Sequence, residues 1–247
     1  MKTPEKLYEF HVANLRSIEL AIDRVARSLR RIISIGDEKT TSAFTRLYAL
    51  LLGAWAECRL HKLIYEPNGF SEPERSLIQT KHTQLERWQT AVETAYRKHY
   101  NIPRATLSDR TLPHSSHSRY LTIINMLEDD LRPIIELRNK LAHGQWAYPL
   151  NANGDDVAQE QMDELRHENI LSLQFKKALI SDLADVIHDL VISLPTFERD
   201  FDQHYKHIME TRRNLQTRSY DSWVNQMQEK YQRGRIKRAQ AFGGDRR

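Results

Sequence analysis

The chain of 247 residues contains 8 glycines and 8 prolines, about half the combined share of roughly 12% found in average proteins. A many-stranded β-sandwich, which needs a turn roughly every 8–12 residues, is therefore excluded, and so are collagen and disulfide scaffolds. The formal net charge is +4, but the last sixteen residues alone carry +5, so the remainder of the chain is close to neutral.

Cys58 is the single cysteine of the chain, so no internal disulfide can form, which is typical of a reducing compartment. The first residues lack the apolar segment of a secretory signal. The longest apolar run, Leu47 to Ala56, is too short to cross a bilayer. The composition therefore predicts a soluble, cytoplasmic protein without a membrane segment.

Residues 5–35 are expected to form one long helix, because their apolar side chains recur at alternating steps of three and four. Arg24, Arg27 and Arg31 form a basic row on this helix. Such a row suits either a solvated helix face or a track for RNA.

The next part of the chain is expected to contain two helices. Gly36 and Asp37 end the first helix and cap the second, which runs over about 40–65 and is apolar enough to be central. After a turn, residues 72–100 predict a more polar, outer helix, and residues 101–117 predict a loop.

A fourth helix is expected over 118–142, and Pro133 inside it should kink or restart the helix by removing a backbone hydrogen bond. Residues 144–168 have an irregular, turn-like composition. The segment 172–194 has a wide apolar arc and predicts a core helix, and two further amphipathic stretches follow Pro195.

The sequence thus predicts an all-α bundle of about five to seven helices with a basic, mobile C-terminal tail, and no strand alternation is present. The expected units are a long N-terminal helix, a helical bundle, C-terminal helices that pack on the bundle, and the tail. Their boundaries are 1–36, 37–194, 195–231 and 232–247.

The end of the fourth expected helix breaks the apolar pattern. At 100° per residue, Arg138 falls inside the arc of side chains that should face the core. A guanidinium on a packing seam is costly unless it meets an acid, carbonyl groups or a phosphate. The apolar members of this arc are Ile124, Leu127, Leu131, Ile134 and Leu141.

His143 shares a different helix face with Asn139 and points about 140° away from Arg138. One straight helix therefore cannot direct both side chains at one atom. Either the helix unwinds over 142–144, or a second protomer completes the site. A purely structural interpretation also exists, because cations and a glycine such as Gly144 are typical of a helix C-terminus.

The stretch Arg138–Gly144 resembles the signature of the HEPN superfamily, an arginine and a polar residue followed by a histidine near a helix end. The expected helices extend a looser resemblance over about 40–194. In place of the tyrosine that toxin-type members often carry, this chain has Gln145. HEPN domains are all-α bundles, commonly dimeric, and many are metal-independent ribonucleases of toxin–antitoxin and phage-defence systems or of RNA processing.

The resemblance implies an endoribonuclease that leaves a 2′,3′-cyclic phosphate, acting as a toxin or antiviral effector on RNA. It also implies a homodimer with a composite site, no cofactor, and an antitoxin or regulatory protein as a partner. His143 would be the general acid/base, Arg138 the phosphate clamp and Asn139 an orienting group. Glu57 and Lys140 are supporting candidates.

Further candidates lie outside this motif. The tail side chains could bind RNA, namely Arg233, Arg235, Lys237 and Arg238. Histidines in two pairs lack a third ligand at a recognisable spacing, so no metal site is expected; they are His114, His117, His204 and His207. The alternatives to an enzyme are a catalytically silent HEPN module that binds RNA or a protein, and a helical interaction protein acting through its first helix and tail.

Overall fold

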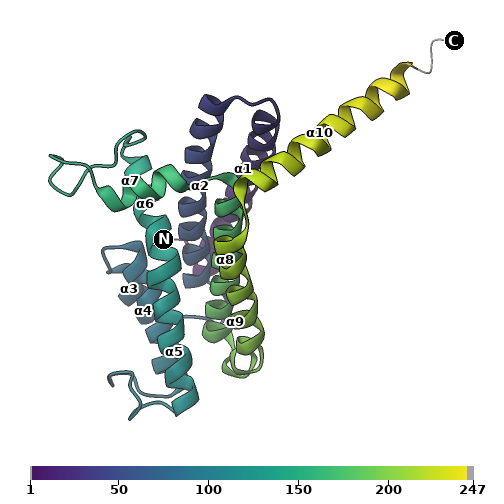
Figure 1. The fold of residues 1–247 in the computed structure, drawn as a ribbon. Coiled ribbons are helices and arrows are strands. Elements are labelled where there is room, and N and C mark those ends of the chain that lie inside the picture. Colours follow the sequence, from purple (N-terminus) through teal and green to yellow (C-terminus); the bar gives the residue numbers. More distant parts are fainter. Residues whose placement is uncertain (1, 244–247) are drawn as a thin grey trace.

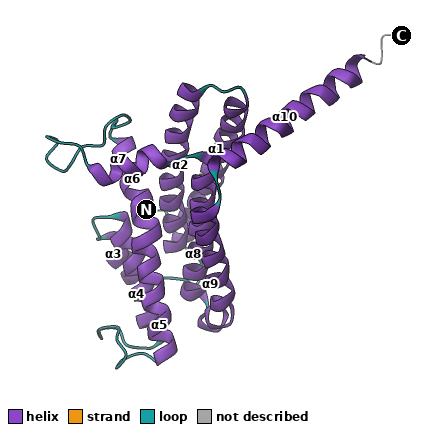
Figure 2. Cartoon of the chain, viewed as in Figure 1, coloured by secondary structure: helices purple, strands orange, loops and turns teal. Residues whose placement is uncertain are grey.

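The computed structural model describes residues 2–243, which form helices joined by turns and loops (Figures 1 and 2). Within this range the all-α class is confirmed, with no strand and an isolated bridge between Leu150 and Val157. There are more helices than the five to seven expected. In chain order they are α1 (Pro4–Ser34), α2 (Glu38–Ile64), α3 (Glu72–Gln79), α4 (Gln84–His99), α5 (His114–Met126), the π-helix η1 (Leu127–Leu131), α6 (Arg132–Ala142), α7 (Gln159–His167), α8 (Ile170–Ile192), α9 (Leu194–Thr217) and α10 (Tyr220–Gly243).

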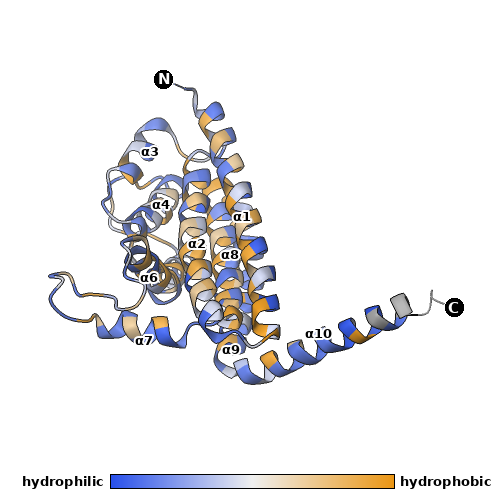
Figure 3. Ribbon diagram, turned by 90° about the horizontal axis from the view of Figure 1, so that it is seen from above, coloured by the Kyte–Doolittle hydropathy of each residue, from blue (hydrophilic) through white to orange (hydrophobic). Residues whose placement is uncertain are grey.

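The second helix occupies the centre of the molecule, as its composition predicts. α2 packs against α1, α4, α6 and α8, and Leu52, Trp55 and Ala56 are almost fully buried. Figure 3 shows that the most hydrophobic helices, α2 and α8, lie inside the bundle, with α1 on one side and α4 and α6 on the other. Burial of each large apolar side chain contributes about 1.5–3 kcal/mol to the stability of the fold. The packing of the outer helices on α2 and α8 is therefore a main source of that stability.

The turn between α1 and α2 follows the expected capping pattern. Gly36 has a φ of +76°, the left-handed conformation that glycine adopts at low cost after a helix. Asp37 then accepts a hydrogen bond of 3.0 Å from the amide of Thr40 and caps α2. These two residues therefore reverse the chain and allow α1 to pack along α2.

The prediction of a single outer helix over 72–100 is wrong in two respects. The chain forms α3 and α4, because Thr83 and Glu86 make a capping box that starts a new helix. α4 is also not an outer helix, since its buried side chains face α2 and α8. Its fully buried members include Trp88, Ala91, Val92, Ala95 and Tyr96.

The predicted interruption at Pro133 takes the form of a π-helical turn. α5 begins within the segment expected to be a loop, η1 follows it, and Pro133 stands in the first turn of α6, where its missing amide costs no helical hydrogen bond. Within η1, Asp130 accepts hydrogen bonds from the guanidinium of Arg212 on α9. The π-helix thus ties the α5–α6 rod to α9.

The segment 144–168 is not irregular throughout, because it contains α7. Lys176 on α8 lies 3.1 Å from the carboxylate of Glu164 and also contacts Glu168, so the end of α7 is fastened to the core. The apolar side chains of Met162 and Leu165 are buried on this helix. The rest of this helix is polar, so its sequence has too few apolar side chains to show a helical periodicity.

The last helix leaves the body of the protein (Figure 1). α10 packs against α1 near its start, and it continues through residues 232–243 of the segment expected to be a tail. Residues 244–247 lie outside the described part of the chain. No helix within residues 2–243 combines the length and apolar character that a membrane span requires.

Candidate functional site

The candidate site is built where α6 crosses α2 at Gly53. A Cβ atom at this position would lie 2.4 Å from the Cβ of Arg138 and 3.2 Å from the carbonyl oxygen of Ile134. Contacts this short do not occur between packed side chains, so a glycine is required for the approach. The close crossing brings the side chain of Arg138 against α2.

Arg138 meets two polar partners beside this crossing. Its Nη2 donates to Oε2 of Glu57 at 2.6 Å and to Oε1 of Gln84 at 2.8 Å. Glu57 stands one helical turn after Gly53 on α2, so both residues face α6. The arginine side chain is 19% exposed, and the ion pair explains how a cation is accommodated on the apolar seam.

Gln84 was not predicted as part of the site. It is the first residue of α4 and is 8% exposed. Its place follows from the capping box of Thr83 and Glu86, a spacing that is visible in the sequence and marks the start of a helix. The sequence therefore held a signal for the helix start, but none for its distance from Arg138.

The C-terminus of α6 is a Schellman motif. The amide of Gln145 donates to the carbonyl of Lys140 at 3.0 Å, and the amide of Gly144 donates to that of Leu141 at 3.1 Å. Gly144 has a φ of +78°. The helix is regular through Ala142, and His143 and Gly144 form the turn in which the chain leaves it.

His143 stands at the end of α6 and lines a pocket of about 480 Å³. Asn139 and Lys140 contribute to the same pocket, whose other walls come from α7 and the loop that follows Gly144. The imidazole of His143 is exposed, and its nitrogens make no hydrogen bond within the described residues. Lys140, by contrast, donates to the carbonyl of Leu150 and fastens the loop.

The predicted site residues therefore fall into two groups on opposite faces of α6. Asn139, Lys140 and His143 share the pocket beside α7. Arg138 and Glu57 meet on the α2 side, and Arg138 is not part of that pocket wall. Within the described residues, the side chains of Arg138 and His143 thus have different surroundings.

The basic residues expected in a tail are arranged around α10. Arg233, Arg235, Lys237 and Arg238 are all exposed, and their helical positions spread them over different faces. Arg238 lines a hollow together with Arg30 of α1. For the metal candidates, no group of three or more histidine, cysteine or acidic side chains suited to a metal occurs within residues 2–243.

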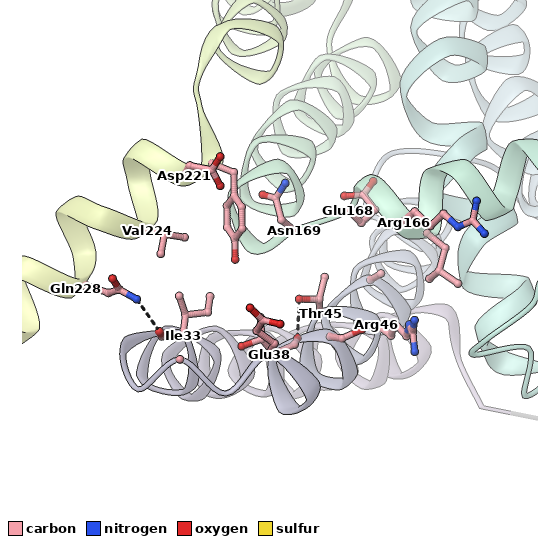
Figure 4. A pocket seen from close by; sticks show the side chains of 16 residues that line it. Ile33, Glu38, Thr45, Arg46, Arg166, Glu168, Asn169, Asp221, Val224 and Gln228 are labelled. Carbon is pink, nitrogen blue, oxygen red and sulfur yellow. Dashed lines mark hydrogen bonds between the residues drawn. The ribbon is translucent and has the colours of Figure 1, made fainter.

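A second pocket, of about 540 Å³, contains none of the predicted residues. Figure 4 shows it between the start of α2, the junction of α7 and α8, and α10, where Gln228 donates to the carbonyl of Ile33 at 3.3 Å. Its wall carries charges of both signs, including Arg46, Arg166 and Asp221. This mixture indicates no particular class of ligand.

No model of a known protein family matches the chain, and searches of curated proteins and of solved structures also find no match. The resemblance of Arg138–Gly144 to the HEPN signature therefore rests on the sequence alone.

Proposed function

We propose that the protein is a metal-independent endoribonuclease of HEPN type, of the kind that acts as a toxin or antiviral effector. The observation that carries the proposal is the exposed His143 at the end of α6, beside Asn139 and Lys140 in an open pocket. A histidine titrates near neutral pH and transfers protons efficiently when solvent and substrate can reach it.

The reaction uses the RNA, the imidazole of His143 and a guanidinium. His143 takes the proton of a ribose 2′-hydroxyl, and the oxygen attacks the adjacent phosphorus. The bond to the 5′-oxygen breaks as the new bond forms, and the protonated imidazole of His143 gives its proton to the departing oxygen. The products are a 2′,3′-cyclic phosphate and a 5′-hydroxyl, and a guanidinium stabilises the charge that develops on the phosphoryl oxygens.

We infer that the guanidinium comes from a second copy of the chain. Arg138 is held by Glu57 and Gln84 on one face of α6, while His143 opens onto the other face. Two copies related by a two-fold axis could place the arginine of one copy beside the histidine of the other. Arg138 would then act as a phosphate clamp that its two partners already orient.

The first test is RNA cleavage in the presence of EDTA. Wild-type protein should cut RNA and leave 2′,3′-cyclic ends, and His143→Ala should lower the rate by about 10²–10⁴-fold. His82→Ala is the matched control, because His82 is also an exposed histidine. Unchanged cleavage by His143→Ala would overturn the assignment of the general acid/base.

The second test mixes two inactive variants, Arg138→Ala and His143→Ala. If each site takes its arginine and histidine from different copies, a mixed dimer holds one complete site, and random exchange should restore about a quarter of wild-type activity. No recovery would contradict the composite site. Arg138→Lys serves as the second variant if Arg138→Ala does not fold, because lysine retains the charge beside Glu57 but lacks the fork.

A catalytically silent module is the alternative that a specific observation favours. The ion pair of Arg138 with Glu57 and the Schellman motif at Gly144 give Arg138 and Gly144 a structural role that requires no catalysis. On this alternative the wild-type protein binds RNA without cutting it, Arg138→Ala weakens binding, and His143→Ala does not. The cleavage assay separates the two functions.

A further inference from the structure

Two adjoining hollows on the α1 side of the molecule are lined by cations from three helices. The first, of about 520 Å³, lies where α1 meets α10 and has Arg30, Lys230 and Arg238 in its wall. The second, of about 370 Å³, lies between α1 and α8 and has Arg27, Arg30 and Lys177 in its wall. Because Arg30 lines both, these five side chains form one strip, which we call the basic track.

The basic track is weakly neutralised. Asp23 is the one carboxylate that lines either hollow within the described residues. Arg27, Arg30, Lys177 and Lys230 form no ion pair shorter than 4.0 Å with any carboxylate in residues 2–243. The five cations outnumber this single carboxylate, so the local potential is positive and attracts a polyanion.

Aromatic side chains stand beside these cations. Trp223 and Tyr231 line the first hollow from α10 and lie eight residues apart, a rise of about 12 Å along a helix. Met227 between them is 8% exposed, both rings also pack partly against the core, and one side of Trp223 is stacked on Tyr220. The two rings are only partly buried, so part of each remains accessible from the hollow.

We propose that the basic track binds single-stranded RNA, with phosphates at the cations and bases against Trp223 and Tyr231. Cations that follow a backbone, combined with rings on which bases stack, are the features that recognise single strands. We favour a single strand over a duplex, because unpaired bases are free to stack on the two rings. The choice of RNA rests on the proposed function.

The basic track is separate from the end of α6. α2 lies between α1 and α6 (Figure 3), and none of the five cations lines the pocket of His143. The track therefore holds RNA at a distance from the site proposed for cleavage. Binding at the track and cleavage at His143 can consequently be measured independently.

The test is fluorescence anisotropy of a short, labelled, single-stranded RNA of mixed sequence, titrated with the full chain over a range of salt concentrations. Arg30→Gln combined with Lys230→Gln should weaken binding at least tenfold at low salt. Each lost phosphate contact makes the negative slope of log K against log salt shallower by roughly 0.7. The slope of this double variant should therefore be shallower by roughly 1.4.

Tyr231→Leu should weaken binding about five- to a hundredfold without changing the salt slope, because it removes stacking and keeps an apolar contact. The matched control is Lys206→Gln with Arg213→Gln, two exposed cations of α9, and it should bind as the wild type does. All variants are made and compared in the same non-cleaving background, His143→Ala, whose own affinity is the reference.

Three results would overturn the proposal. The first is wild-type affinity in the Arg30/Lys230 double variant when its circular dichroism is unchanged. The second is an equal loss of affinity in the α9 control. The third is displacement of the RNA by vesicles of anionic lipid as effective as displacement by unlabelled RNA, which would assign the track to a membrane. Absence of cleavage alone would contradict the proposed function and leave the track intact.

Discussion

The contact between Gly53 and Arg138 decides how the candidate site is formed. A methyl group at Gly53 would overlap the stem of Arg138. Overpacking costs typically about 1–3 kcal/mol, against a gain of up to about 1 kcal/mol when alanine replaces glycine inside a helix. We expect Gly53→Ala to lower the free energy of unfolding by about 1–2 kcal/mol, measured by urea denaturation.

Gly234→Ala provides the matched control for this substitution. Gly234 also lies inside a helix, but a Cβ there meets only the far end of the Arg238 side chain, at 4.0 Å. The control should therefore leave the midpoint unchanged or raise it slightly. Equal effects of the two substitutions would show that α2 and α6 can separate without cost, contrary to the crossing described above.

A second property set by single residues is the pH dependence around His188. Its ring lies 3.8 Å from Glu66 and 3.6 Å from Asp189, and the Glu66 carboxylate raises the pKa of His188 above 6.5. Although burial opposes the charge of Glu66, interactions with His188, Lys62 and Tyr8 lower the pKa of this carboxyl to about 2.

The two shifts act on opposite sides of neutrality. A raised histidine pKa stabilises the fold fully below its unfolded value of about 6.5, and the gain is lost as the pH rises through the folded value. A lowered carboxyl pKa stabilises the fold above about pH 4.5, and this gain is lost as the pH falls towards 2. We expect the urea midpoint to fall more steeply between about pH 6.5 and about pH 8 in the wild type than in His188→Gln. A wild-type slope in His188→Gln would assign it to another group.

At the scale of elements, η1 shows how a local irregularity fixes a long-range contact. Nε of Arg212 lies 3.1 Å from both carboxylate oxygens of Asp130, and the carboxylate side chain is 14% exposed. Hydrogen bonds between charged groups contribute about 1.5–3 kcal/mol. We expect Asp130→Asn and Arg212→Met each to lower the free energy of unfolding by about 2 kcal/mol, and the double variant to lose at least about 1 kcal/mol less than their sum. Strict additivity in this cycle would contradict the coupling of η1 to α9.

The helices that the sequence predicts well are those with a dense apolar pattern or a clear cap. The extent of α1, the central position of α2 and the interruption near Pro133 follow from periodicity, capping and a missing amide. The break between α3 and α4 was readable in the Thr83–Glu86 spacing, whereas α7 is held by Lys176 on another helix. A helix stabilised from a distance leaves little trace in its own residues.

The same distinction applies to the candidate site. The position of Arg138 on the seam and the divergence of His143 follow from helical geometry, and an acid near the arginine follows from its buried charge. Gln84 and the loop that Lys140 fastens depend on contacts between elements that are distant in the chain. Those contacts become predictable only once the packing of α2, α4 and α6 is known.

At the scale of the whole molecule, α10 is held at one end only. Met227 is buried on the body, whereas Ile236 further along the helix is 49% exposed. Packing against α1 therefore stabilises the first half of α10, and residues beyond Gln232 add little to global stability. We expect a chain ending at Gln232 to keep the wild-type melting temperature and to lose RNA affinity, because Arg238 of the basic track is removed.

In contrast to the truncation, Met227→Ala should destabilise the fold, lowering the free energy of unfolding by about 2 kcal/mol or more. Calorimetry and RNA titration on both variants distinguish the two halves, and a lower melting temperature after truncation would show that the outer half of α10 also supports the fold.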